Sequence, residues 1–468
     1  MRPSCLRRSD SALKIAAVAF FWIAAASVVP AQSPVTVNVD LATPGPIIPD
    51  NFLGVSYEMS AVLPDSSGHL YFSPANTALI QTFNVLGLKS LRIGGNAADL
   101  GPIPSQSDVT NLFGFAESAG VDVFYTLKLK DSDAAANAPI ADFIVANYGS
   151  LLTCFVVGNE PNFYVKSFGD YETDVNKYMA AIHEGKFCGA DAEDGGSYAA
   201  HFAAAYDHSP RVALATQHHY LGSGPSNEGS KGRDVLLSAS DLENYANLLK
   251  GLEPAIGKDG LTFRITETNS FSRAGGSGSS NSFASALWGL DYLHWWASHG
   301  AVGLNFHTGD VVTVGGGTVL PALYAVFTTA QGGYFVHPLG YAVKAFDVGG
   351  HGTAIPVSLS NPDGVNLTAY GVLGTNALYL TVINKEHDSG AKTAKVTFSG
   401  VSAYKTGAAM FLSAPGNDVA ATAGITLGGS EIANNGTWTG MFSSLAAPTG
   451  GRFELEVPPA TAVVVRLE

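Results

Sequence analysis

The apolar run Cys154-Phe-Val-Val157 passes directly into the polar group Gly158-Asn-Glu-Pro161. A short apolar run closed by turn residues is typical of a buried strand. Seven further runs of this kind recur along the chain: Phe52–Glu58, Ser90–Gly95, Asp122–Leu127, Lys186–Asp191, Arg211–Gln217, Thr262–Glu267 and Ala301–Phe306. Helix-like stretches separate or follow them: Pro74–Leu86, Tyr171–Glu184, Asp234–Leu252, Ser282–Ser298 and Pro338–Phe346. This alternation predicts an α/β fold, a (β/α)8 TIM barrel over residues 49–350.

The chain changes character after the predicted barrel. Short alternating runs such as Leu378–Asn384 and Ala460–Glu468 are separated by turns rich in Gly and Asn. This pattern predicts a C-terminal β-sandwich over residues 351–468. The segment 32–48 contains Val35-Thr-Val-Asn-Val-Asp40, which alternates in the same way. We therefore expect this N-terminal strand to join the sandwich.

Residues 1–31 have the pattern of a signal peptide. Four basic residues precede the apolar run Ile15–Val29, and Val29-Pro-Ala31 has the small residues of a cleavage site. The run is short for a membrane span, although an uncleaved anchor helix is the alternative. We expect a secreted or periplasmic protein that begins near Gln32 and has no membrane association after cleavage.

Composition excludes several classes of protein. The 468 residues are 46% hydrophobic and 14% charged, which is too apolar for a disordered chain. A net charge of −14 disfavours nucleic acid as a partner. No spacing of His and Cys suggests a metal site, so we predict neither a metal nor a cofactor. Cys154 and Cys188 fit either a buried free thiol or a disulfide.

Polar residues stand at the carboxyl ends of the predicted strands, where barrel enzymes have their active sites. Among these residues are Glu58, Asn96, Asn159, Glu160, His218, His219, Tyr220, Glu267 and His307. Glu160 and Glu267 are the carboxylate pair that we expect to catalyse, one as acid/base and one as nucleophile, as in glycoside hydrolysis. Pro161 predicts an extended backbone at Glu160. The aromatic residues Trp288, Tyr292, Trp295 and Trp296 have helical spacing and are predicted to be core.

An ordered set of motifs resembles glycoside hydrolase family 79, which includes heparanases and exo-acting β-glucuronidases. The motifs are Gly54-Val-Ser-Tyr-Glu58, Leu91-Arg-Ile-Gly-Gly-Asn96, Gly158-Asn-Glu-Pro-Asn162, Gln217-His-His-Tyr220, Thr266-Glu-Thr-Asn269 and Phe283-Ala-Ser-Ala-Leu-Trp288 leading to Asn305-Phe-His307. The resemblance extends from about Asn51 to Phe346. It implies a retaining β-glucuronidase that acts on a β-glucuronide carbohydrate.

The resemblance also implies a role for individual residues. Glu160 is expected to be the acid/base and Glu267 the nucleophile. Asn159 is expected to hold the sugar 2-hydroxyl and Tyr220 to hydrogen-bond Glu267. Substrate-binding positions are expected at Glu58, Asn96, His219, Tyr324 and the backbone of Gly275 and Gly276.

One position departs from the family pattern. Where the family commonly has a Tyr five residues after the nucleophile, this chain has Ser272, followed by Arg273-Ala-Gly-Gly276. The departure bears on how a uronate carboxylate is bound, and Arg273 offers a compensating charge. The alternatives are an endo-acting enzyme of the heparanase kind, a glucosidase or xylosidase of the same clan, and an inactive carbohydrate-binding barrel.

Overall fold

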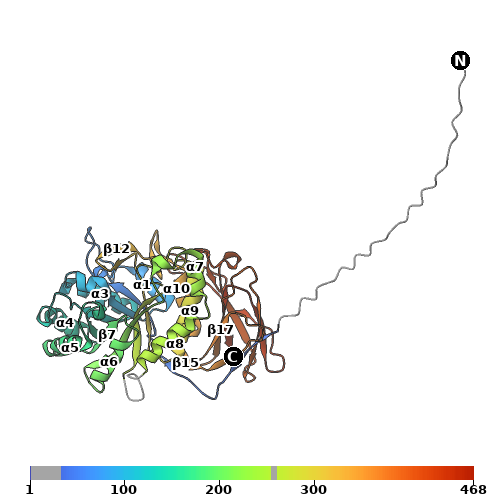
Figure 1. The fold of residues 1–468 in the computed structure, drawn as a ribbon, viewed down its shortest axis with the longest axis horizontal. Coiled ribbons are helices and arrows are strands. Elements are labelled where there is room, and N and C mark those ends of the chain that lie inside the picture. Colours follow the sequence, from blue (N-terminus) through green and yellow to red (C-terminus); the bar gives the residue numbers. More distant parts are fainter. Residues whose placement is uncertain (2–32, 254–260) are drawn as a thin grey trace. The chain divides into compact units, whose positions relative to one another are not determined.

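Eight parallel strands close a barrel in the computed structural model of the protein, in the order β10-β3-β4-β5-β6-β7-β8-β9 (Figure 1). They are β3 (Leu53–Glu58), β4 (Ser90–Gly94), β5 (Asp122–Leu127), β6 (Leu152–Val157), β7 (Phe187–Ala192), β8 (Val212–Tyr220), β9 (Phe263–Asn269) and β10 (Leu304–His307). The structure describes Met1 and residues 33–253 and 261–468, so the predicted signal peptide lies outside the described residues. The predicted TIM barrel is confirmed, and each predicted strand overlaps an observed one.

Helices surround the barrel. They are α1 (Thr77–Leu86), α2 (Asn96–Leu100), α3 (Gln106–Ala119), α4 (Ala134–Tyr148), α5 (Phe168–Ala181), α6 (Ser197–Tyr206), α7 (Gly229–Leu236), α8 (Asp241–Leu252), α9 (Phe283–Ser298) and α10 (Pro338–Gly349). All five predicted helices are present, although the stretch Asp234–Leu252 divides into the end of α7 and α8. Sequence reasoning did not predict α2, α3, α4 or α6.

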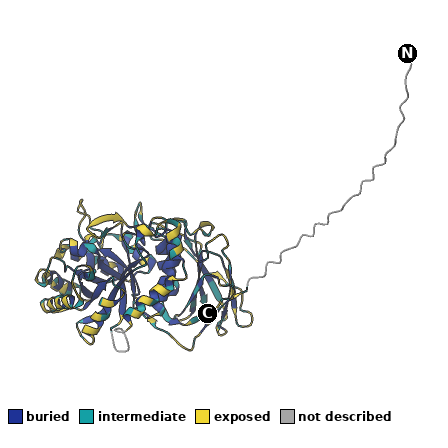
Figure 2. Ribbon diagram, viewed as in Figure 1, coloured by how far each residue is buried: buried dark blue, intermediate teal, exposed yellow. Residues whose placement is uncertain are grey.

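Helix α9 is buried along nearly its whole length, and its ribbon is correspondingly dark in Figure 2. Trp288, Tyr292, Trp295 and Trp296 all lie in the core, as predicted. Such all-round burial needs a second layer outside the barrel. The C-terminal sheets provide that layer.

Two sheets form the predicted β-sandwich. The smaller has the order β16-β1-β19-β23, and the larger has the order β2-β15-β17-β18-β24-β20-β21 with β22 beside β20. Their strands are β1 (Val35–Val39), β2 (Ile47–Ile48), β15 (Gly352–Ile355), β16 (Val357–Ser360), β17 (Leu367–Leu373), β18 (Leu378–Asn384), β19 (Ala394–Ser399), β20 (Gly407–Ser413), β21 (Thr426–Leu427), β22 (Ser443–Ser444), β23 (Phe453–Val457) and β24 (Thr461–Leu467). Strand β1 pairs antiparallel with β16 and parallel with β19, which confirms that the N-terminal strand joins the sandwich.

The two faces of the larger sheet bury different cores. Leu380 and Val465 point into the sandwich and pack with Val37 of β1. Ile383 and Val464 belong instead to the core that includes the barrel helices. Across this contact the buried Lys385 Nζ donates to Asp291 of α9 over 2.9 Å. Residues 33–468 accordingly form one compact unit.

Two hairpins lie between the last barrel strand and α10. The first joins β11 (Val311–Val314) to β12 (Thr318–Pro321), and the second joins β13 (Phe327–Ala330) to β14 (Gly333–Val336). Because they follow β10, they lie at the carboxyl end of the barrel. The first hairpin becomes part of the candidate site.

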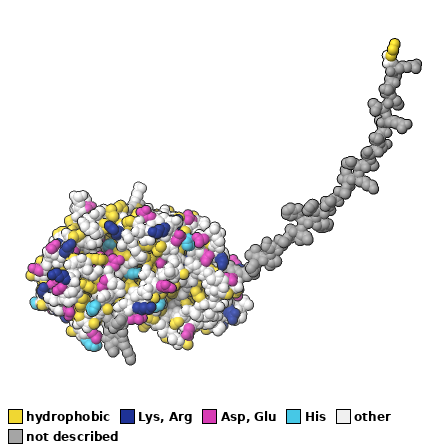
Figure 3. Space-filling view, in the orientation of Figure 1, with side chains coloured by type: hydrophobic (Ala, Val, Ile, Leu, Met, Phe, Trp, Pro, Cys, Tyr) yellow, Lys and Arg dark blue, Asp and Glu magenta, His cyan; other side chains and the backbone are white. Residues whose placement is uncertain are grey.

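Charges of both signs are scattered over the face shown in Figure 3, and Lys and Arg do not gather into a patch there. Among the described residues, none of the helices is both long enough and apolar enough to cross a membrane.

Candidate active site

Glu160 and Glu267 meet at the carboxyl end of the barrel. One oxygen of each carboxylate and one ring nitrogen of His218 all lie within 4.8 Å of one another. Both carboxylates line a cleft of about 440 Å³, together with Asn159 and Tyr220. The strands therefore bring together the pair that the sequence analysis selected.

Glu160 lies beyond the end of β6 and has a left-handed backbone, with φ 50° and ψ 53°. The prediction that Pro161 would hold Glu160 extended was wrong. The Glu160 N–H donates to the Asp191 carbonyl of β7 over 2.9 Å, and Pro161 begins a short 3₁₀ turn. A left-handed residue other than Gly costs about 1–3 kcal/mol, which the surrounding structure must offset. This bend directs the carboxyl group into the cleft.

Glu267 is surrounded by donors. The Tyr220 hydroxyl donates to Oε1 over 2.8 Å, and the Arg92 guanidinium donates to Oε2. Burial disfavours the charged form, but the nearby positive charges, with His307 and His218 largest, lower the pKa of Glu267 to about 2. The side chain is therefore an ionised carboxylate at neutral pH, as a nucleophile must be.

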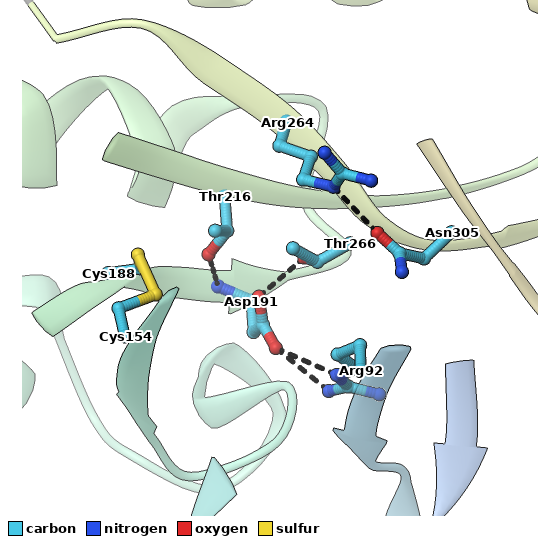
Figure 4. Close-up of a disulfide and its surroundings, with 8 residues drawn as sticks. All are labelled: Arg92, Cys154, Cys188, Asp191, Thr216, Arg264, Thr266 and Asn305. Carbon is cyan, nitrogen blue, oxygen red and sulfur yellow. Dashed lines mark hydrogen bonds and ion pairs between the residues drawn. A yellow bond between two sulfur atoms is a disulfide. The ribbon is translucent and has the colours of Figure 1, made fainter. Parts of the chain in front are cut away.

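Arg92 is the centre of a buried network that sequence reasoning missed (Figure 4). It is fully buried and donates through Nη2 to Asp191 over 2.8 Å and to Asn159 over 2.7 Å. Burial opposes its charge, but Asp191 and Glu267 outweigh this and raise the pKa of Arg92. The available signal was a charged residue in the middle of an otherwise apolar strand.

His218 links the acid/base to this network. Its Nδ1 lies 3.1 Å from Glu160 Oε1, and its Nε2 lies 3.4 Å from Asp191 Oδ2. Burial alone would lower the pKa of His218, but the charges of Glu267 and Asp191 raise it to about 10. A protonated His218 donates to both carboxylates, so it orients Glu160.

Asn159 is held from two sides. Its Oδ1 accepts from Arg92, and its backbone N–H donates to Asp99 over 2.8 Å. The buried Asp99 also accepts from the Tyr164 hydroxyl over 2.7 Å. Asn159 therefore presents its remaining amide group at a fixed position in the cleft. Asp99 is a second residue that the sequence analysis missed.

Glu58 and Asn96 hold the first hairpin in place. The Glu58 carboxylate accepts from the backbone N–H of Ala97 over 2.8 Å and of Thr313 over 2.9 Å. Asn96 Nδ2 donates to the Thr313 carbonyl over 2.9 Å. Asn96 also lines the cleft, whereas Glu58 reaches it through His307, whose Nε2 lies 3.4 Å from Glu58 Oε1. Both side chains clamp the hairpin to the barrel.

The turn after the nucleophile lies beside the first hairpin, where Ala274 packs with Val312 and Tyr324. Ser272 pairs with the loop after β8, because its N–H and hydroxyl both donate to the Gly222 carbonyl. Arg273, Ala274 and Gly275 then take three successive left-handed conformations. The Gly275 and Gly276 N–H groups donate within the turn, to the Ser272 carbonyl and to Ser280 Oγ.

Tyr324 is buried and lines the cleft in a turn between β12 and β13. Its ring lies 6.3 Å from that of Tyr220 and 6.0 Å from that of His307. Tyr324 therefore lies beside Tyr220, the residue that donates to Glu267.

His219 points into the aromatic core under the site. Its Nδ1 lies 2.8 Å from the Tyr292 hydroxyl, and its ring stacks on that of Tyr292. Burial lowers the pKa of His219 to about 4, so the ring is neutral at neutral pH. One edge lines a second cavity beside the cleft.

Glu160, His218 and Glu267 also offer three donor atoms of the kind that bind a cation. The Arg92 guanidinium and a protonated His218 already supply positive charge there. A metal would have to displace the proton of His218 and approach Arg92, both of which cost free energy. The absence of a metal therefore stays our prediction.

A second set of polar residues fills the barrel below this network (Figure 4). Arg264 is buried, donates to Asn305 over 2.7 Å and stacks on the Phe124 ring. Phe124 also packs with Cys154 and Cys188, which form a disulfide that joins β6 to β7. The structure therefore decides between the two alternatives for these cysteines in favour of the disulfide.

Comparisons with known proteins find likenesses to glycoside hydrolases. Residues 369–464 match the model for the glycosyl hydrolase family 79 C-terminal beta domain. A β-glucuronidase of Aspergillus niger is 31% identical over 108 residues, which are 22% of this chain and 20% of the relative. The chain thus matches about a fifth of the length of that curated relative.

Solved structures show the same fold over nearly the whole chain. A 4-O-α-L-rhamnosyl-β-D-glucuronidase of Fusarium oxysporum matches with a TM-score of 0.69 and 18% identity, covering 92% of this chain and 99% of its own. A family 51 arabinofuranosidase of Xanthomonas axonopodis pv. citri also has a TM-score of 0.69, with 12% identity and coverage of 93% and 100%. The domain match thus identifies a family 79 C-terminal domain at residues 369–464, and the solved structures show that nearly the whole chain has a fold shared with glycoside hydrolases.

Proposed function

We propose that the protein is a retaining, exo-acting β-glucuronidase. The observation that carries the proposal is the approach of Glu160 and Glu267 oxygens to within 4.8 Å. Retaining glycosidases have carboxyl groups about 5–5.5 Å apart, whereas inverting enzymes need about 6.5–9.5 Å to admit a water. The relatives with glucuronidase activity support the choice of sugar.

The proposed reaction has two steps. In the first, Glu160 donates its proton to the glycosidic oxygen as a Glu267 oxygen attacks the anomeric carbon and the leaving group departs. In the second, Glu160 removes a proton from water, which attacks the same carbon and releases Glu267. Arg92 and Tyr220 hold Glu267 ionised and oriented, and His218 orients Glu160.

The first hairpin supports exo action. Thr313, Val314, Gly315 and Gly316 line the cleft on the side of β10, away from Glu160. Since the acid faces the leaving group, the hairpin closes the end that holds the non-reducing sugar. A chain that continued beyond this sugar would meet the hairpin. The endo-acting alternative needs this end open.

We propose that Tyr324 contacts the uronate carboxylate. The N–H groups of Gly275 and Gly276 already have partners within the turn, so the buried phenol at the cleft wall is the better-supported donor. A hydrogen bond to a charged group is worth about 1.5–3 kcal/mol. Tyr324→Phe should therefore lower kcat/KM for an aryl β-glucuronide roughly 10- to 150-fold and leave weak activity on the matching glucoside nearly unchanged. Equal losses on both would contradict the contact.

A chromogenic panel and product stereochemistry test the function. We expect hydrolysis of a β-glucuronide in preference to a β-glucoside, a β-xyloside and a sulfated uronate-containing polysaccharide. NMR should detect the β-anomer as the first product. An α-anomer formed first would rule out the retaining mechanism, and a preference for the glucoside would overturn the glucuronidase assignment.

We also propose export, on the basis of the basic and apolar pattern of residues 1–31. Expression of the full chain in a secreting host should release a protein whose N-terminal sequence begins near Gln32. Retention of an intact N-terminus on membranes would favour the anchor helix instead.

A further inference from the structure

We propose that a leaving-group subsite for an uncharged aromatic or sugar aglycone lies beside Glu160, and that Glu193 disfavours anionic aglycones there. The inference rests on the proposed function and names the class of substrate. It concerns a second cavity of about 440 Å³, whose lining includes Phe163, Glu193, Tyr220, Asn244, Asn247 and Leu248.

The second cavity adjoins the catalytic cleft. Phe163, Glu193 and Tyr220 line both spaces. The cavity lies on the side of Glu160 opposite to the first hairpin, because its walls come from the loops after β6 and β7, the end of β8, and helix α8. A group that accepts a proton from Glu160 as it departs therefore leaves toward this cavity.

Phe163 provides an apolar surface at the mouth. It ends the 3₁₀ turn that begins at Pro161, and its side chain is 65% exposed. Because the Phe163 side chain buries little apolar surface, it contributes little to the free energy of folding. Aromatic rings stack favourably on other rings and on apolar sugar faces. Phe163 is thus placed to pack on an aglycone.

Glu193 gives the cavity its charge. Its backbone is fixed by Asn162, whose side chain bonds to both the Glu193 N–H and its carbonyl. Within residues 33–253 and 261–468, its carboxylate has no hydrogen-bond or ion-pair partner. Burial and the charges of Glu160 and Glu267 raise the pKa of Glu193 to about 7, against the opposing effect of His218.

The charges divide along the cleft. Lys130 and Arg273 line the catalytic cleft. The lining of the second cavity has no Lys or Arg among the described residues, and the charge of its protonated His218 is already matched by Glu160 and Asp191, which face the two ring nitrogens. Asn244 and Asn247 of α8 instead offer neutral donors and acceptors. A substrate whose negative charge lies on the glycone, near Lys130 and Arg273, fits this distribution of charge. An aglycone with a sulfate or carboxylate places a second negative charge beside Glu193.

The test compares phenyl β-glucuronide with 4-sulfophenyl β-glucuronide in wild type and Glu193→Gln. For each protein, kcat/KM for the phenyl substrate is divided by kcat/KM for the sulfophenyl substrate. Comparing this ratio between wild type and Glu193→Gln cancels the difference in leaving-group reactivity, which is the same in both proteins. We expect the wild type to disfavour the sulfonate about tenfold more than the variant does, the effect of like charges near a surface. The difference should grow as pH rises through 7. Glu117→Gln removes one exposed acidic charge from α3 and should leave the ratio unchanged.

Phe163→Ala provides an independent variant. It should raise KM for both aryl substrates about tenfold with little change in kcat. Equal ratios in wild type and Glu193→Gln, or an unchanged KM in Phe163→Ala, would overturn the subsite. If β-glucuronides are not cleaved, the proposed function fails. The same aglycone pair is then compared on whichever β-glycoside of the panel is cleaved, which tests the subsite separately.

Discussion

Two arginines lie inside the barrel, and their surroundings differ sharply (Figure 4). Arg92, near the carboxyl ends of the strands, contacts the carboxylates of Asp191 and Glu267. Arg264, lower in the barrel, donates to Asn305 and to backbone carbonyls and has no carboxylate within ion-pair distance among the described residues. Burial lowers the pKa of Arg264 to about 9, whereas the two carboxylates raise that of Arg92.

The difference separates a functional charge from a structural one. A buried carboxylate such as Glu267 needs compensating charge to stay ionised, and Arg92 supplies part of it, together with His307 and His218. Arg264 has no such task, and its stem and planar group fill the barrel against Phe124. Loss of Arg92 should therefore disturb chemistry and stability together, and loss of Arg264 should disturb stability alone.

The largest effect should come from the carboxylate that Arg92 compensates. Glu267→Ala removes the nucleophile, so kcat should fall by roughly 10⁴-fold or more in assays with an aryl β-glucuronide. Added azide should restore turnover by forming a glycosyl azide of inverted configuration. Normal activity in the variant would assign the nucleophile elsewhere.

Arg92→Met should have the next largest effect. It removes the guanidinium that contacts both Asp191 and Glu267 and leaves only His218 and His307 to compensate these buried carboxylates, which costs about 3–5 kcal/mol of unfolding free energy. Loss of the donor to Glu267 should also lower kcat by about 10²–10³-fold. Denaturant titration and steady-state kinetics measure the two losses. If kcat falls without the unfolding free energy, or the reverse, then Arg92 does not support both catalysis and stability.

The pH dependence of stability should reveal the ionised state of Glu267. The folded-state pKa of Glu267 is lowered to about 2 from an ordinary value of 4.5. Its contribution is therefore complete above pH 4.5 and is lost as pH falls toward 2, at no more than about 1.4 kcal/mol per pH unit. The stability advantage of wild type over Glu267→Gln should shrink across this window in urea titrations. A constant advantage would mean that the ionised form is not stabilised.

The smallest effect should come from Arg264→Met. The variant keeps an apolar stem against Phe124 but leaves Asn305 Oδ1 without its donor, which costs about 1–2 kcal/mol. We expect kcat within twofold of wild type, because Arg264 makes no contact with the catalytic pair among the described residues. A large loss of kcat with little loss of stability would show that Arg264 also contributes to catalysis.

The sequence predicted the parts of the fold that depend on local pattern. All eight barrel strands are apolar runs closed by turn residues, so their existence could be predicted. Helix α4 was missed because Pro139 lies within it and indicates a break. Helix α3 was missed although Ser105 and Asp108 form a capping box at its start.

In the candidate site, too, the residues that depend on local pattern could be predicted and those that depend on distant contacts could not. Glu160 and Glu267 are recognisable because each lies at the carboxyl end of an apolar run that forms a strand. Asp191 acts on them from β7, beside the strand before Glu160, and Arg92 acts from β4, which neighbours neither carboxylate's strand, so both contacts depend on the barrel closing in one register. Glu58 and Asn96 also stand at the predicted positions, but their contacts depend on where a distant hairpin lies. The Cys154–Cys188 disulfide likewise required knowing that both side chains point inward.

The pairing of β1 has a consequence for how the chain assembles and can be divided. Val35–Val39 are made before the barrel, yet their partners Val357–Ser360 and Ala394–Ser399 are made after it. The smaller sheet of the sandwich is therefore completed only when both ends of the chain are present. A fragment of residues 351–468 would leave two facing strand edges unpaired, and such edges promote aggregation. The matched domain of residues 369–464 should thus be produced with the N-terminal strand, and not by itself.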